Sequence, residues 1–238
     1  MLEISKSLLI SFAAVAILLP VVRYALRKMS PAGRLAQMTP EEARYMQKKE
    51  RKLTLAYYFY ACVLSVFFAG ALAMLASIIH LSSDHMFVLT PNFQALFAPG
   101  LLLGLTVALL PLRLSQRSLL GSDYDLYKRY MQQQEGLNST RSYGILFGVM
   151  LGLSLVTSWF AMRWHINIDE DQVQVINLLN EERTYEHKAI ESIRYLGAEG
   201  EYLISFNDRT SINTTYLKPA SLEMIALLSE KSGHRVIR

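Results

Sequence analysis

Residues 53–79 read LTLAYYFYACVLSVFFAGALAMLASII and contain no Asp, Glu, Lys, Arg or His. Three further stretches, residues 7–22, 93–112 and 143–162, share this character. A helix needs about 20 apolar residues to cross the roughly 30 Å hydrocarbon core of a bilayer. Long stretches without a charge therefore predict an α-helical integral membrane protein, with a four-helix transmembrane domain in residues 1–163.

The stretch at residues 7–22 is the shortest of the four, and a secretory signal peptide is the competing interpretation. Lys6 precedes it, as a short basic segment precedes the apolar part of a signal peptide. No small-x-small cleavage site follows, and Arg23, Arg27 and Lys28 come directly after it. These features favour an uncleaved helix.

The charges are divided unevenly along the chain and predict an orientation. Residues 1–164 carry 16 basic and 8 acidic side chains, whereas residues 165–238 carry 8 basic and 12 acidic ones. The basic residues concentrate in loops 23–52 and 113–142, and loop 80–92 has no Lys or Arg. Because basic loops stay in the cytoplasm, we expect the N-terminus and the C-terminal region to be extracytoplasmic, in a bacterial inner membrane. No basic face with interleaved aromatics indicates a nucleic-acid partner.

Both basic loops contain helix signals. Thr39-Pro40-Glu41-Glu42 has a capping residue, a first-turn proline and acids at the positive end of the helix dipole, so a helix is expected to run into the stretch at 53–79. Residues 122–134 have tyrosines at a spacing of three beside Lys128 and Arg129. This pattern predicts a helix on the inner membrane surface, with a partner-docking helix as the alternative.

After residue 163 the apolar residues alternate, which is typical of strands. The expected strands are residues 164–168, 173–177, 183–187, 190–196, 202–206 and 210–214. An amphipathic helix follows at residues 219–231, and Gly233 is its stop signal. Residues 164–238 are therefore predicted to form a soluble α+β domain, in which one capping helix covers an antiparallel sheet.

One run in this domain carries a family resemblance. Its first part is Tyr185-x-x-Lys188-Ala189-Ile190-Glu191-Ser192-Ile193, and Tyr202-x-Ile204-x-Phe206-Asn207-Asp208 follows. The pattern resembles the bacterial PH-like modules attached to membrane helices, although Arg209 stands where that pattern usually has Gly. The resemblance implies a binding or scaffolding unit that is often cytoplasmic, whereas the charge rule places this one outside. The domain is also shorter than a seven-stranded PH barrel, so an incomplete sheet is expected.

Glycines recur at four-residue spacing in two of the apolar stretches. Gly144, Gly148 and Gly152 fall on one helical face, and Gly100 and Gly104 begin another such pattern. Small residues at this spacing let a second helix backbone approach closely. They predict a helix-packing or oligomer interface, either within the four helices or with a second copy or another membrane subunit.

Motifs that carry chemistry are scarce. His80, Asp84 and His85 are three potential metal ligands within six residues, but no second cluster accompanies them. The chain has no P-loop, no G-x-G-x-x-G and no G-x-S-x-G. We therefore expect no metal, no cofactor and no catalytic residue.

The resulting hypothesis is a non-enzymatic membrane protein that presents a small interaction module, as a subunit or accessory of a larger membrane assembly. Two alternatives stay open. One is a transport component that moves a neutral or lipidic substrate along a glycine-lined groove between the third and fourth helices. The other is a membrane-embedded enzyme that acts on lipid with His80, Asp84 and His85.

Overall fold

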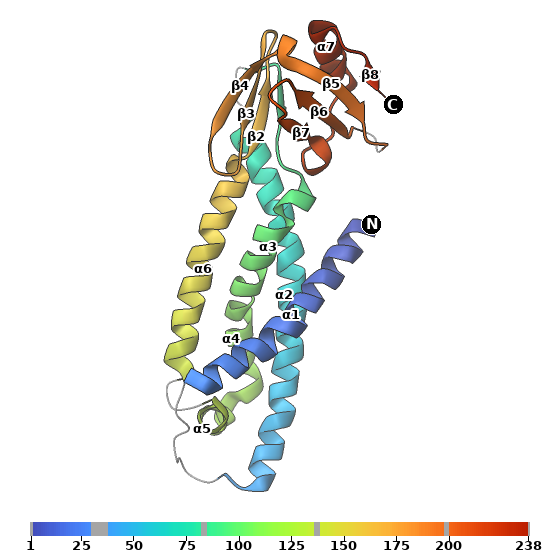
Figure 1. Ribbon diagram of the computed structural model, residues 1–238. Coiled ribbons are helices and arrows are strands. Elements are labelled where there is room, and N and C mark those ends of the chain that lie inside the picture. The colour runs from blue at the N-terminus through green and yellow to red at the C-terminus, as the bar shows by residue number, and fades with distance from the viewer. Residues whose placement is uncertain (1, 30–37, 82–84, 136–138, 198–199, 238) are drawn as a thin grey trace. The chain divides into compact units, whose positions relative to one another are not determined.

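The computed structural model describes residues 2–29, 38–81, 85–135, 139–197 and 200–237 (Figure 1). The chain forms two compact units, one of Met1–Phe68 with Gly100–Leu155 and one of Ala69–Pro99 with Val156–Arg238. Helices α2 (Pro40–Ile79), α3 (Phe93–Val107) and α6 (Ser139–Arg163) each contribute residues to both units. Parts of the two basic loops, residues 30–37 and 136–138, lie outside the described residues.

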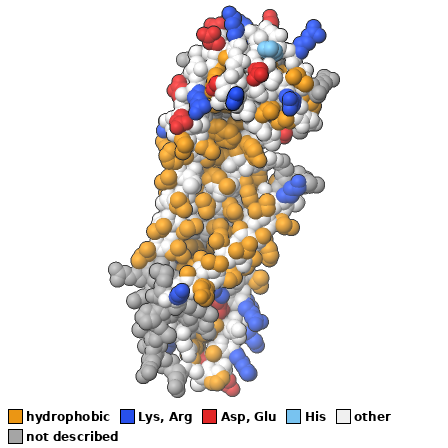
Figure 2. Space-filling model, in the orientation of Figure 1, with side chains coloured by type: hydrophobic (Ala, Val, Ile, Leu, Met, Phe, Trp, Pro, Cys, Tyr) orange, Lys and Arg blue, Asp and Glu red, His pale blue; other side chains and the backbone are white. Residues whose placement is uncertain are grey.

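In the described part of the chain, four helices are long and apolar enough to cross a membrane: Ile4–Ala25, Pro40–Ile79, Phe93–Gln133 and Tyr143–Arg163. Each overlaps one of the four predicted stretches, so the prediction of four long apolar helices is confirmed. Hydrophobic side chains cover these helices on the face shown in Figure 2, and many of the charged side chains lie over the sheets.

The first unit also contains α1 (Leu2–Met29), α4 (Leu109–Leu120) and α5 (Tyr124–Glu135). Proline explains the break between α3 and α4. Pro111 has no N–H to donate to the Val107 carbonyl, and its ring crowds that group, so the α-helix is interrupted at Ala108. The α-helix is therefore interrupted near Pro111, whereas Pro99 lies inside an unbroken α3.

The N-terminal end of α2 forms as its sequence predicts. The Thr39 hydroxyl accepts a hydrogen bond from the Glu42 N–H at 3.3 Å, and the Glu42 carboxylate accepts one from the Thr39 N–H at 2.9 Å. This reciprocal pair is a capping box, which satisfies two backbone donors at the helix start. The helix then continues without a break to Ile79, as expected.

Polar contacts tie α1 and α5 to the same part of α2. Glu50 forms an ion pair with Arg23 at 2.9 Å and accepts a hydrogen bond from the Tyr130 hydroxyl at 2.9 Å. Lys49 pairs with Asp123 at 2.6 Å. The predicted helix at residues 122–134 is confirmed, and Tyr130 is one of its buried residues.

The second unit contains two four-stranded sheets. The first has the order β1-β2-β3-β4, with β1 (Phe87–Leu89), β2 (His165–Ile168), β3 (Gln172–Ile176) and β4 (Glu182–Glu186). The second has the order β7-β6-β5-β8, with β5 (Ile190–Tyr195), β6 (Tyr202–Phe206), β7 (Ser211–Asn213) and β8 (Val236–Ile237). All neighbouring strands are antiparallel except β5 and β8. Short 3₁₀ turns occur at Gly121–Asp123, His187–Ala189 and Thr214–Tyr216.

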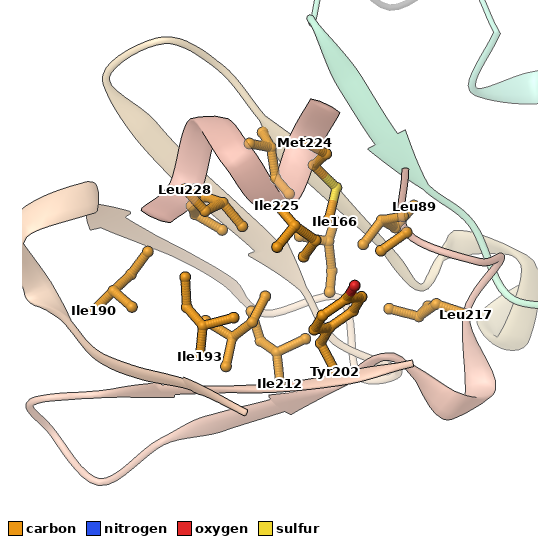
Figure 3. Close-up of a cluster of buried hydrophobic side chains, with 14 of the residues drawn as sticks. Leu89, Ile166, Ile190, Ile193, Tyr202, Ile212, Leu217, Met224, Ile225 and Leu228 are labelled. Carbon is orange, nitrogen blue, oxygen red and sulfur yellow. The ribbon is translucent and has the colours of Figure 1, made fainter. Parts of the chain in front are cut away.

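The helix α7 (Leu222–Ser232) covers the core between these sheets (Figure 3). Ser221 caps its start, and Gly233 ends it in the left-handed conformation at φ 73°, as the predicted stop requires. Met224, Ile225 and Leu228 on α7 meet buried residues of both sheets, such as Ile166 and Ile193. The six expected strands correspond to β2–β7 within two residues at each end, and the capping helix is confirmed.

Strand β1 was not expected, because residues 80–92 showed no clear alternation. Phe87, Val88 and Leu89 pair with Ile168, Asn167 and Ile166 of β2. The segment between α2 and α3 is thus hydrogen-bonded into the sheet that begins after α6. Any membrane crossed by these helices therefore has this segment and the C-terminal sheets on one side.

A second attachment follows β1. Asn92 begins α3: its side-chain oxygen accepts from the Ala95 N–H at 3.1 Å. Its amide nitrogen donates to the carbonyls of Thr215 at 2.8 Å and Leu217 at 3.0 Å. A single side chain therefore caps a helix and holds the C-terminal domain to the start of that helix.

Replacement of Asn92 separates these two roles. We expect Asn92→Ala to lower the free energy of unfolding by about 1–2 kcal/mol, because it removes a helix cap and two donors. Asn92→Ser keeps a capping oxygen and removes the amide donors without placing a charge beside the two carbonyls, so its loss should be smaller. Thermal unfolding of the detergent-solubilised protein measures both, and equal losses in the two variants would show that the cap contributes nothing.

Candidate functional site

A partly open pocket of about 480 Å³ lies in the second unit. The ends of α2 and α6 form one wall and the first sheet forms the other. Its lining residues are Ile79, His80, Trp159, Met162, Arg163, His165, Asn167, Gln174, Ile176, Asn180 and Glu182. Apolar residues come mostly from the helices and polar ones mostly from the strands, so the pocket is amphipathic.

Strand alternation explains why the sheet wall is polar. On β2, Ile166 and Ile168 belong to the core, which leaves His165 and Asn167 on the opposite face. The register pairs Asn167 with Gln174 on β3 and His165 with Ile176. The same strands therefore supply core residues on one face and the pocket on the other.

Three side chains on this wall form a directed hydrogen-bond chain. The Asn167 amide nitrogen donates to the Gln174 side-chain oxygen at 2.8 Å, and the Gln174 amide nitrogen donates to the Glu182 carboxylate. Asn167 is only 5% exposed, and its side-chain oxygen has no partner among the described residues. A buried acceptor without a donor is unfavourable, so the site favours an occupant that donates a hydrogen bond.

The charge on Glu182 determines which way both amides point. A carboxylate accepts only, so Gln174 must present its nitrogen to Glu182 and its oxygen to Asn167. Asn167 must then present its nitrogen to Gln174. The atom left without a partner in the pocket wall is therefore an acceptor oxygen.

Two histidines, one at the end of α2 and one on β2, stack on each other in the pocket lining. The rings of His80 and His165 have centroids 4.0 Å apart. The Nδ1 atom of each lies 2.7 Å from a backbone carbonyl, of Ala76 and Arg163 respectively. Because a carbonyl only accepts, both Nδ1 atoms carry a hydrogen. Burial lowers the pKa of His165 from its usual 6.5. The hydrogen bond to the Arg163 carbonyl acts in the opposite direction, and the positive charge of Arg163 lowers the pKa further. His165 is therefore neutral at neutral pH.

Arg163 supplies the permanent positive charge at this site. Its guanidinium lies over the Trp159 ring, 5.7 Å from the ring centroid. The ion pairs found among the described residues do not include Arg163. A fixed cation and an exposed carboxylate, Glu182, thus line one pocket.

The turn after β3 places apolar side chains at the same end of the sheet. Asn177 builds this turn: its side-chain oxygen accepts from the N–H groups of Leu179 and Glu181, both at 2.9 Å. Asn180 adopts φ 62°, a conformation that asparagine tolerates well. Leu178 and Leu179 are consequently 51% and 74% exposed. The pairing of His165 with Ile176 sets this turn beside the end of α6.

The glycines singled out from sequence have two different environments. Gly100 and Gly104 on α3 are buried, and a Cβ on Gly104 would clash with the backbone of Ser65 on α2. Gly144, Gly148 and Gly152 on α6 are exposed, and a Cβ on any of them would meet nothing within 4 Å.

The candidate ligands in residues 80–85 do not act as one group. The Nδ1 atom of His85 contacts the Asp169 carboxylate at 2.8 Å, which ties this loop to the turn between β2 and β3. His80 instead stacks on His165 in the pocket. Asp84 lies outside the described residues.

Sequence reasoning did not identify the pocket. Arg163, Asn167, Gln174 and Glu182 are far from any motif, and their convergence depends on strand register. The available signal was the polar half of the alternation in residues 164–168, which puts His165 and Asn167 on the face away from the core. Comparison with models of known protein families, with curated proteins and with solved structures finds no match to this chain.

Proposed function

We propose that this chain is a non-enzymatic integral membrane protein of a bacterial inner membrane, which holds a PH-like interaction module at the membrane surface. In this proposal it is a subunit or accessory of a larger membrane assembly. The observation that carries it is the pairing of β1 with β2. Through this pairing the sheets are joined to α2, α3 and α6 rather than tethered by one flexible linker.

The arrangement of strands supports a PH-like module. Residues 164–238 alone were expected to be short of a full barrel, and β1 supplies a further strand from elsewhere in the chain. The two sheets enclose one apolar core that a C-terminal helix covers. The hairpin that contains β6 and the helix that follows it are the parts of this arrangement that the sequence resemblance implies.

The exposed glycine face on α6 supports association with a second membrane helix. Within the chain, Gly104 already meets α2, whereas Gly144, Gly148 and Gly152 face open space. Close approach of two backbones is the main use of such a face in a bilayer. A second copy and a different membrane subunit are the two partners that fit.

The distribution of basic residues supports an extracytoplasmic position for the module. Loops 23–52 and 113–142 carry the Lys and Arg residues, and the segment that contributes β1 carries none. Because β1 pairs with β2, this segment and the module share one side of the membrane.

Gly148→Leu tests the proposed assembly. We expect the variant to fold normally, because the added side chain meets nothing in its own chain, but to lose its companions or its dimer in mild detergent. The matched control is Gly70→Leu, on an exposed position of α2 that also has open space. Tagged purification followed by mass measurement of the intact complex gives the result. A wild-type protein recovered only as a lone monomer would contradict the proposal.

The two alternative functions gain no support from specific contacts. Gly104 on α3 packs against Ser65 of α2, whereas the α6 glycines face open space, so the contacts of these residues do not favour a common groove. His80 stacks on His165, whereas His85 contacts Asp169. The contacts of these two histidines therefore do not favour a shared catalytic centre.

A further inference from the structure

We propose that the pocket between the first sheet and the ends of α2 and α6 binds the phosphoethanolamine headgroup of a phospholipid. The ammonium group would donate to Asn167 and pair with Glu182, and the phosphate would pair with Arg163. This inference rests on the proposed function in one respect: it requires that α2 and α6 end at a membrane surface.

The sheet wall of the pocket is complementary to a positively charged hydrogen-bond donor. The buried oxygen of Asn167 is an acceptor without a partner among the described residues, and Glu182 is a carboxylate that uses one oxygen for Gln174. A primary ammonium has three N–H donors and one positive charge, so it suits an uncharged acceptor such as Asn167 and a carboxylate such as Glu182.

The helix wall is complementary to an anion, because it carries Arg163. Arg163 is the permanent cation of the pocket, and its planar guanidinium binds phosphate oxygens in pairs. Arg163 is the last residue of α6, and Glu182 is the first residue of β4. Both line the pocket, so opposite charges on its two walls fit a zwitterion whose anion and cation are joined by a short linker.

This charge pattern discriminates among common headgroups. Phosphocholine has no N–H donor, so it would leave the Asn167 oxygen unsatisfied. Phosphoglycerol offers hydroxyl donors but no positive charge for Glu182, and its net charge is repelled by that carboxylate. Phosphoethanolamine alone among these three satisfies Asn167, Glu182 and Arg163 together.

The apolar lining fits the part of a lipid below its headgroup. Ile79, Trp159 and Met162 supply this part of the wall. Trp159 is 57% exposed near the end of α6, and tryptophan prefers the interfacial depth of a bilayer. Leu178 and Leu179 on the neighbouring turn add exposed apolar surface beside the same helix end.

The test uses the full-length protein in detergent micelles and three phospholipids with identical acyl chains, carrying ethanolamine, choline or glycerol headgroups. Native mass spectrometry counts the bound lipid as its concentration is raised. We expect the ethanolamine lipid to bind at least about tenfold more tightly than the other two. Glu182→Gln and Arg163→Gln should each remove about tenfold of that affinity, since each loses a charge-assisted contact. Glu186→Gln is the matched control, because Glu186 lies on the same face of β4 outside the pocket.

Two further measurements separate the possible failures. Free phosphoethanolamine should bind far more weakly than the lipid, and equal affinity would overturn the assignment to a membrane lipid. Equal binding of the three lipids, or an unchanged preference in Glu182→Gln, would overturn the headgroup proposal. Membrane insertion is tested independently by alkaline carbonate extraction of cell membranes. Release of the protein there would overturn the proposed function, whatever the lipid preference in micelles.

Discussion

Gly104→Leu should prevent α2 and α3 from packing and lower the free energy of unfolding by about 3 kcal/mol or more. Even a methyl group at this position would clash with the backbone of Ser65, so no change of side-chain rotamer relieves the overlap. The helices must move apart, and neighbouring contacts are lost with them. These include the hydrogen bond from the Tyr57 hydroxyl to the Leu105 carbonyl at 3.0 Å and the packing of Ala61 against Leu105.

Gly148→Leu is the matched control for stability, because it adds the same side chain on α6, where nothing lies within 4 Å. Thermal unfolding in detergent should show a large decrease in the midpoint for Gly104→Leu and little change for Gly148→Leu. Similar midpoints for the two variants would mean that α2 and α3 do not approach each other as closely as described.

This contrast shows what the sequence could predict about the glycines. Spacing alone placed Gly144, Gly148 and Gly152 on one face and identified Gly100 and Gly104 as a second pattern. Spacing does not state which helix lies opposite. The structure uses the pattern on α3 internally and leaves the pattern on α6 exposed, a difference that depends on how the helices pack.

The sequence predicts local structure correctly where short-range interactions alone determine it. The Thr39 capping box, the break near Pro111 and the left-handed Gly233 all follow from backbone hydrogen bonding and sterics within a few residues. Strands β2–β7 follow from alternation, because each has one face in the core and one face outside it.

Strand β1 and the pocket could not be predicted in this way, because both depend on contacts between distant segments. Phe87 and Leu89 are only two alternating apolar residues, a pattern too short to indicate a strand. Their pairing with β2 is formed across about 80 residues of chain. Asn167 and Glu182 likewise reach one pocket only through the register of β2, β3 and β4.

Leu89→Asp should detach β1 and thereby loosen the C-terminal domain from α2 and α3. Leu89 is 5% exposed, pairs with Ile166 and belongs to the core beneath α7. A carboxylate there would lose its hydration without gaining a partner, a change that costs more than about 4 kcal/mol. Detachment of β1 costs less free energy than burial of the carboxylate, because it returns the carboxylate to water and breaks only the short pairing of β1 with β2.

The consequence is measurable as protease sensitivity, since β1 lies on the short connection between α2 and α3. In Leu89→Asp we expect rapid cleavage within residues 85–92 and a lower thermal midpoint, while the four apolar helices stay folded. Met86→Asp introduces the same charge three residues earlier at a side chain that is 54% exposed, so it should resist protease like the wild type. Protection of Leu89→Asp to the wild-type level would show that β1 does not hold the domain in place. The predicted contrast follows from burial alone, because the two substitutions add the same charge to the same connection.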